Sequence, residues 1–332
     1  MTPLVILSIG GAVAGNVGKR AMSGEITEHD GEKADELRLT VSNFDGRLAK
    51  PARGTVVTVE VGFEETGIVK VGQFTITEVV KRGALAVFEI TGHSADLKKT
   101  LKQQKARSWV KGKTLGDVVR QVAGDNGLSP AIAGELAAVK IDKIIAQVNE
   151  SDMHLLTRLA RHYGALFKVA EGKLLFVKKG SGQTAGGGAA ASATVTPNDL
   201  EHDFQIADKD RPARGKIKAH HYDRATAKRK TIESGAGGGG GAGDAPDFTF
   251  PQTFATEIEA QKAVDARKKD LQRKEKSFSG TFRTGFFGVA PGGVLASSGF
   301  GDDDDCAWTV KRRVFDFGGK GLVTRSEAEV KK

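Results

Sequence analysis

The chain has 332 residues, with 50 Lys and Arg against 41 Asp and Glu and a single cysteine, Cys306. One cysteine excludes an intrachain disulfide, and with it the disulfide-framed scaffolds of small secreted proteins. No run of about 18 apolar residues occurs, so we expect no membrane-spanning helix. Residues 4–9 are apolar, but the stretch is short and no Lys or Arg precedes it, so we expect no signal peptide.

The first ninety residues alternate apolar and polar side chains with the period of a β-strand. Turn signals such as Asp45-Gly46 separate the alternating stretches, which are residues 37–41, 57–63, 74–76 and 86–90. Several short strands at this spacing predict a small β-barrel or sandwich.

Residues 4–18 read as a strand followed by a glycine-rich turn, but the nucleotide-binding motifs are incomplete. Ala12 stands where a dinucleotide fold needs its second glycine. Arg20 follows Gly18-Lys19, where a P-loop needs Ser or Thr. We interpret this segment as an edge strand and a loop.

The period changes to that of a helix after residue 94. Apolar residues spaced three and four apart predict a helix over 114–124, with a Thr114–Asp117 capping box and Gly124 at its end. Residues 140–145 then read as a strand. A second helix follows, which Asn149 or Ser151 can cap and Gly164 stops. With a hairpin around Glu171-Gly172, residues 94–180 form an αβαββ unit.

The last part of the chain returns to strands. Residues 180–197 read as a linker, 198–232 as strands with basic outer faces, and 234–246 as too glycine-rich for a regular element. A capping box at Thr256 and Glu259 starts a helix that ends near Lys276. The final strands are predicted at 277–283, 307–314 and 322–329. The fold class is therefore α+β, with β-rich ends around an α/β middle.

No constellation of residues indicates catalysis, a cofactor or a metal. Residues 302–305 are four adjacent aspartates, which we interpret as a solvated acidic turn because they lack the interleaved spacing of a calcium loop. His154 and His162 are too far apart to bind one ion, and nothing in the sequence pairs Cys306 with a histidine. The basic stretches 98–113 and 209–230 fit a solvated face, a surface for an acidic protein or, alternatively, a nucleic-acid surface.

Several motifs occur in an order that resembles the late control D family of contractile-tail phages. The resemblance lies in residues 34–47, 72–79, 105–109 and 114–119, and most specifically in residues 147–165 with their Gln-Val-Asn-Glu-Ser-Asp start. Members of this family look like baseplate hubs and like the N-terminal part of type VI secretion spike proteins.

The resemblance implies a structural role rather than an enzymatic one. It implies two barrel domains similar to the tail tube protein, over 1–93 and 181–332, with the αβαββ domain (94–180) between or interleaved with them. Three chains would form a ring that joins the tail tube protein to the central spike protein and contacts other baseplate proteins. The expected location is the virion tail baseplate, after synthesis in the host cytoplasm. No catalytic residue, cofactor, metal or small-molecule substrate is implied, and we expect no direct nucleic-acid binding.

The resemblance also carries over motif positions as structural or interface residues. They are Trp109, Leu115, Asn149, Glu150, Ser151, Asp152, Leu159, Tyr163 and Gly164. We interpret residues 149–152 as helix caps, with a contact surface as the alternative. We expect Trp109 to pack a domain junction, with an interface anchor as the alternative.

Two other functions stay open at this point. The basic charge balance, and the regulatory sense of the family's name, favour a nucleic-acid-binding regulatory protein, whose duplex DNA affinity would fall steeply with salt. An enzyme that cuts cell-wall polymer would need a pair of acids in a cleft, and peptidoglycan zymography would detect it.

Overall fold

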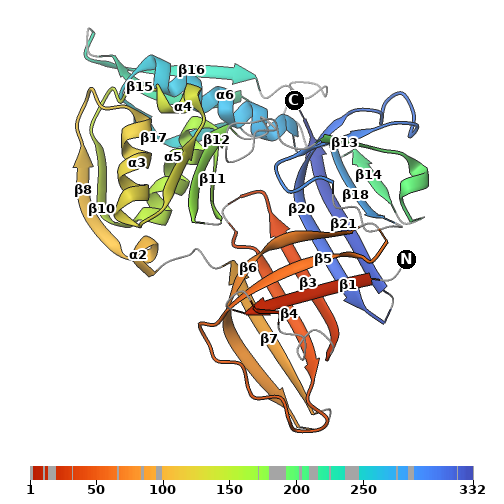
Figure 1. The fold of residues 1–332 in the computed structure, drawn as a ribbon. Helices are drawn as coiled ribbons and strands as arrows, with labels where there is room; N and C mark the ends of the chain where they lie inside the picture. Colours follow the sequence, from red (N-terminus) through yellow and green to blue (C-terminus); the bar gives the residue numbers. More distant parts are fainter. Residues whose placement is uncertain are drawn as a thin grey trace.

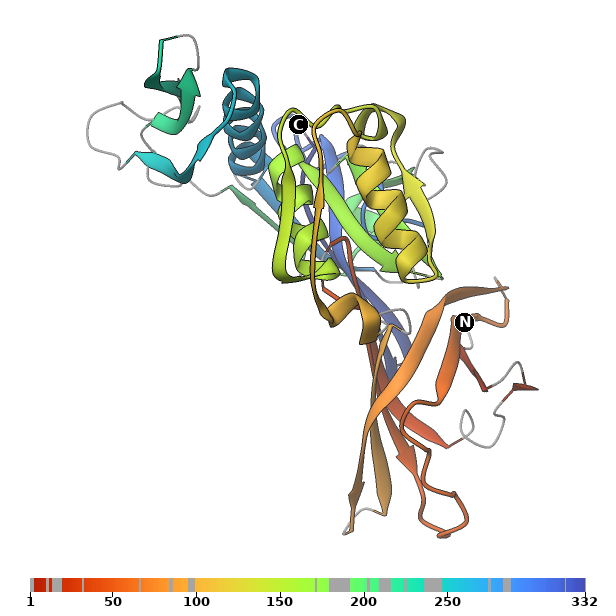
Figure 2. The ribbon, with the colours of Figure 1, turned by 90° about the vertical axis from the view of Figure 1, so that its left-hand side faces the viewer.

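The computed structural model describes residues 3–9, 12–13, 20–31, 33–65, 67–83, 86–94, 99–170, 172–178, 192–201, 204–208, 216–223, 226–235, 247–273, 276–282, 288–319 and 321–331. One sheet of thirteen strands runs through the molecule in the order β14-β18-β21-β20-β3-β4-β7-β6-β5-β1-β2, and β19, itself paired with β13, adds to β20. An α/β unit and a smaller lobe lie to one side of this sheet (Figures 1 and 2). The fold is thus mostly β with an α/β part, which confirms the α+β class.

The N-terminal module holds the first strands, paired antiparallel around one apolar core. These are β1 (Pro3–Ile9), β2 (Ala12–Val13), β3 (Ala21–His29), β4 (Glu36–Ser42), β5 (Val56–Phe63), β6 (Gly67–Arg82) and β7 (Val87–Ser94). Leu37, Leu39 and Val41 are buried while the residues between them are not, as their alternation predicts. β1 pairs with β5, and β2 ends the sheet, so the predicted edge strand is present.

The C-terminal module continues the same sheet around a second core that includes Trp308. Its strands are β13 (Ser192–Val195), β14 (Gln205–Asp208), β18 (Lys276–Phe282), β19 (Val294–Ser297), β20 (Ala307–Gly318) and β21 (Gly321–Val330), with a 3-10 turn at Pro197–Asp199. The three strands predicted at the end of the chain are present. The prediction of a linker over 180–197 was wrong at its end, because β13 pairs in parallel with β19.

The α/β unit packs two principal helices against short strands. Its elements are α2 (Lys99–Lys102), β8 (Gln104–Trp109), α3 (Leu115–Asp125), β9 (Ser129–Ile132), α4 (Gly134–Ala137), β10 (Ile145–Ser151), α5 (Asp152–Tyr163), β11 (Ala165–Ala170) and β12 (Lys173–Lys178). The Thr114–Asp117 capping box and the β11–β12 hairpin are confirmed. α3 ends beyond Gly124, and Gly127 takes the left-handed conformation instead, with φ of 61°.

The prediction of a strand over 140–145 was wrong, since β10 begins only at Ile145. Ile141 is buried and exchanges backbone hydrogen bonds with the segment before α3, whereas Ile144 is 61% exposed. Ile141 therefore lies in the core and Ile144 faces solvent, so the apolar residues of this stretch do not form one face of a strand.

The smaller lobe comprises β15 (Lys216–Asp223), β16 (Lys228–Gly235), β17 (Phe248–Phe254) and α6 (Glu257–Arg273), and it has an apolar core of its own. Figure 2 shows α6 between the strands of the lobe and the α/β unit. Thr256 accepts a hydrogen bond from the backbone N–H of Glu259 at 3.2 Å, which confirms the predicted helix start, and the helix ends at Arg273. The glycine-rich residues 236–246 lie outside the described residues. Among the helices described, none has the length and apolarity to cross a membrane.

Candidate functional site

The start of α5 gathers the motif residues 149–152 at a bulge in the β8–β10 ribbon. Asn149 takes a left-handed backbone conformation, with φ of 48°, where the register of the two strands shifts between Gln147 and Glu150. Ser151 is the N-cap, and its Oγ accepts a hydrogen bond from the backbone N–H of His154 at 3.2 Å. Of the two caps that the sequence allowed, the structure therefore uses Ser151.

Asp152 does more than follow the cap, because its carboxylate is fully buried in a polar cluster. The carboxylate accepts hydrogen bonds from Lys105 Nζ at 2.7 Å, Asn126 Nδ2 at 2.8 Å and Gln147 Nε2 at 2.9 Å. Arg107 also pairs with it and, at the protein surface, with Asp125. Two strands and two helices are thus joined through one carboxylate.

Electrostatics keep Asp152 ionised despite its burial. Burial by itself raises the pKa of the carboxyl group. The hydrogen bonds from Lys105, Asn126 and Gln147, together with the charge of Arg107, outweigh this effect and hold the pKa below its ordinary value. Below that value the cluster loses its central charge, so its contribution to stability depends on pH.

Four further motif residues stabilise the unit, three in its core and one at its surface. Trp109 is 2% exposed and donates from Nε1 to Gln121 Oε1 at 2.8 Å. It lies in the unit's own core, with Leu115 and Leu159, and so offers no exposed anchor at a domain boundary. Glu150 makes a two-pronged ion pair with Arg158 of α5, at 2.7 and 3.0 Å.

The last two motif residues lie at the other end of α5, where the lobe meets the α/β unit. Gly164 caps the helix with φ of 63°, and a Cβ there would lie 3.5 Å from Ala266 of α6. Burial raises the pKa of Tyr163 to about 12. His162 stacks on Phe254 of the lobe with 5.7 Å between ring centroids, and burial lowers the pKa of this histidine.

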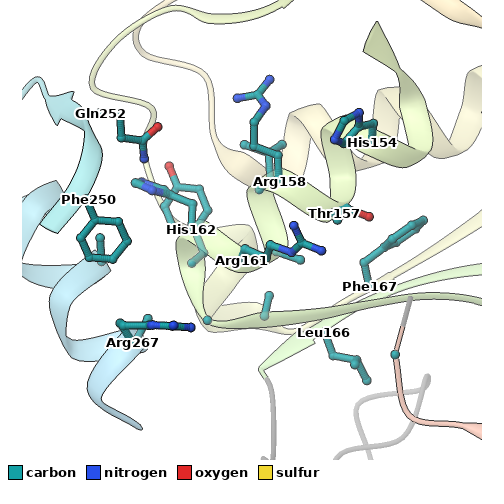
Figure 3. A pocket seen from close by; sticks show the side chains of 18 of the residues that line it. His154, Thr157, Arg158, Arg161, His162, Leu166, Phe167, Phe250, Gln252 and Arg267 are labelled. Atoms are coloured by element: carbon teal, nitrogen blue, oxygen red, sulfur yellow. The ribbon is translucent and has the colours of Figure 1, made fainter. Parts of the chain in front are cut away.

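A cleft of about 1220 Å³ opens beside this contact (Figure 3). One wall is α5, with His154, Arg158 and Arg161 on a single stripe, and the opposite wall is the lobe, with Phe250 and Arg267. His29 at the end of β3 and Lys311 and Arg312 in the middle of β20 line it from the sheet side. Lys143 reaches across to Glu259 of the lobe at 3.0 Å, which ties the two walls together.

The other motifs considered from sequence form no reaction centre. Asp304 pairs with Lys276 at 2.7 Å, and the Asp305 carboxylate accepts from the backbone of Gly299 and Phe300, so 302–305 is an acidic turn. Burial raises the pKa of the Cys306 thiol, which disfavours the reactive thiolate. Within the described ranges, no three His, Cys, Asp or Glu side chains are grouped as metal ligands would be.

Comparison with known proteins decides the family. The model of the phage tail baseplate hub family (GPD) matches residues 32–320. The chain belongs to the phage tail baseplate hub family. It is 32% identical over 355 residues to the "Probable baseplate hub protein" of Escherichia phage P2, an alignment that covers 96% of this chain and 90% of that protein.

Baseplate hub proteins are structural components of virion tails, so this hub-family chain is a structural protein rather than an enzyme. The resemblance to the late control D family is confirmed.

Solved structures share the fold at low sequence identity. The tail protein from Neisseria meningitidis MC58 has a TM-score of 0.72 at 14% identity, over 99% of this chain and 97% of that one. The c3393 protein of E. coli, a component of the type VI secretion system, has a TM-score of 0.57 at 11% identity, over 98% and 77%. The expected similarity to a type VI protein therefore exists at the level of fold.

Sequence reasoning found the motif around α5 but missed the partners that make it a cluster. Lys105, Arg107 and Trp109 alternate along β8, and this period-two pattern was a usable signal that they share the inward face. The cleft gave no local signal, because its walls come from segments far apart in the chain.

Proposed function

We propose that three copies of this hub-family chain form a ring that joins the tail tube protein to the central spike protein. Each chain would supply two tube-like barrels, over 1–93 and 181–332, with the α/β domain (94–180) between them and the lobe inserted in the second. Three chains would then present six barrel equivalents to the tube. Other baseplate proteins would contact the ring, and the chain would be made in the host cytoplasm before assembly.

The observation that carries this proposal is the hairpin β20–β21, which belongs to both modules. The first half of β20 supplies Trp308 and Val310 to the C-terminal core, and its second half supplies Phe315 and Phe317 to the N-terminal core. β20 also pairs with β3, from Arg312 opposite His29 to Phe317 opposite Gly24. Backbone hydrogen bonds therefore continue from one module into the next without a linker.

Side chains lock the junction at the point where the hairpin passes from one core to the other. Arg313 and Glu28 form a buried ion pair, with Nε 2.6 Å from Oε2, and Arg313 also donates to the carbonyl of Val289 at 3.2 Å. A Cβ on Gly24 would overlap the Phe317 ring, so glycine permits the close approach of the strands. A fixed angle between modules is what a ring of repeated barrels requires.

The ends of the sheet support assembly with further copies. Along the sheet path of the described strands, β14 pairs on one side with β18, and β2 closes the opposite end. Strand edges can be completed by a neighbouring subunit, and a head-to-tail interface closes into a ring when its rotation fits.

The test is the mass and symmetry of the purified chain, alone and with its tube and spike proteins. Light scattering after size exclusion gives the mass, and negative-stain microscopy gives the symmetry. We expect a threefold ring that carries tube on one face and spike on the other. A monomer that forms no ring with either partner would overturn the proposal.

A further inference from the structure

We propose that the cleft between α5 and the lobe binds an extended acidic segment of another protein, with an apolar side chain of that segment packed against Phe250. This inference goes beyond the joining of tube and spike. It does not depend on the ring, because every wall of the cleft comes from one chain.

Charge favours an acidic occupant. Seven Lys and Arg line the cleft against three acids, Asp30, Glu259 and Glu327. Two more acids, Glu150 and Glu329, pair with lining cations from just outside, and the cations still exceed the acids. Arg161 comes from the α5 wall and Arg267 from the lobe wall (Figure 3), so carboxylates along one strand could meet both walls.

Size and shape favour a polypeptide over a small molecule. The volume exceeds the roughly 300–1,000 Å³ of ordinary small-molecule pockets. The α5 wall repeats its polar groups at helical spacing, and the β17 wall places Phe250 and Gln252 two residues apart on one face of a strand. Pro251 lacks an N–H and lies in β17, so recognition would depend on side chains rather than on addition of a strand.

The aromatic wall argues for a peptide and against a nucleic acid. Phe248 and Phe250 meet at 81°, and Phe250 and Phe254 at 79°, with centroids 5.1 and 5.6 Å apart. Rings in edge-to-face contact cover one another's faces, whereas bases need open faces on which to stack. The half-buried Phe250 instead offers an apolar contact for one aliphatic or aromatic side chain.

The experiment measures binding of a fluorescein-labelled peptide of alternating Glu and Leu to the full-length chain by fluorescence anisotropy. We expect saturable binding that weakens as NaCl is raised, and no binding of the matching Lys and Leu peptide. Arg161→Glu should lower the affinity by about tenfold, because one charge contact becomes repulsive. Lys173→Glu makes the same change in charge on the exposed β12 strand, outside the cleft, and should leave the affinity unchanged.

A second variant covers the possibility that Arg161→Glu disturbs the fold. Gln252→Glu adds repulsion from the opposite wall, where the side chain is exposed. Each variant must keep the melting temperature of the parent chain, so that a change in peptide affinity reports on the cleft and not on unfolding. Absence of peptide binding would overturn the inference, as would binding that neither cleft variant weakens. Binding of oligothymidylate that Arg161→Glu abolishes, without peptide binding, would assign the cleft to nucleic acid instead.

Discussion

Two junctions in this molecule are built in opposite ways. Where the two β modules meet, strands share backbone hydrogen bonds, the hairpin β20–β21 enters both cores, and Arg313 and Glu28 form a largely buried ion pair. Where the lobe meets the α/β unit, the contacts are side chains such as His162 on Phe254 and Lys143 with Glu259, beside a cleft of about 1220 Å³.

The difference indicates that the junction between the β modules is rigid and that the junction between the lobe and the α/β unit is less so. A continuous sheet with a buried core resists bending, as the proposed ring of barrels would require. A junction of a few side chains beside an open cleft has lower local stability and leaves surface available to a partner. Changes at the module junction should therefore destabilise the whole fold, and changes at the lobe junction should act locally.

The largest effect is expected from Arg313→Met at the module junction. This substitution leaves the Glu28 carboxylate buried without its partner, which should cost about 3–5 kcal/mol in the free energy of unfolding. Urea denaturation followed by circular dichroism measures it. The double variant with Glu28→Gln should recover part of the loss. A loss in unfolding free energy below about 1 kcal/mol, typical of an exposed ion pair, would show that water reaches the pair at the junction.

Asp152→Asn tests the cluster under α5, with a smaller expected loss of about 2–3 kcal/mol, since Lys105 and Arg107 keep some contact with water. Asp125→Asn is the matched control. It also removes a carboxylate from Arg107, but at the surface, so its cost should stay below about 1 kcal/mol. Equal losses in the two variants would contradict the central role of Asp152.

The same carboxylate predicts a dependence on pH. Its pKa in the folded chain lies below the unfolded value, so its stabilisation is complete above the ordinary carboxyl pKa of about 4 and is lost as pH falls through the folded value. Unfolding free energy measured against pH should fall in this acid range, and Asp152→Asn should flatten the fall. An unchanged slope in the variant would assign the acid sensitivity to other carboxylates.

The helix caps should give effects of about 1 kcal/mol. Ser151→Ala removes the side-chain acceptor for the N–H of His154 and should cost about that amount. Thermal unfolding compares it with Ser129→Ala in β9, where the exposed residue caps no helix and little change is expected.

Two glycines should respond with opposite signs. Gly164→Ala places a Cβ on a left-handed residue and should destabilise by about 1 kcal/mol. Gly124→Ala lies inside α3 with open space around it, and should stabilise by a similar amount, about 0.8–1.0 kcal/mol. The two melting temperatures, measured side by side, check the assignment of each helix end.

Much of this architecture could be predicted because local pattern sets it. The alternation of Leu37, Leu39 and Val41 becomes β4, and the Thr114–Asp117 box starts α3, since burial and capping act within a few residues. The motif around Ser151 was likewise recognised as a helix start.

The rest depends on contacts that the local pattern does not encode. β13 is a strand only because β19 pairs with it, a hundred residues away in the chain. The sequence predicts Asp152 only as a cap residue. In the structure, Lys105, Asn126 and Gln147 from other elements donate hydrogen bonds to its carboxylate. The cleft likewise requires α5, β17, the end of β3 and the middle of β20 to meet in space.

The most direct test is a cryo-electron microscopy structure of the chain bound to its tube protein, from which the two β modules of one copy are superposed. The account predicts three copies in a closed ring, with the modules related by close to one sixth of a turn about the ring axis. A ring with another number of copies, or modules that no such rotation superposes, would contradict it.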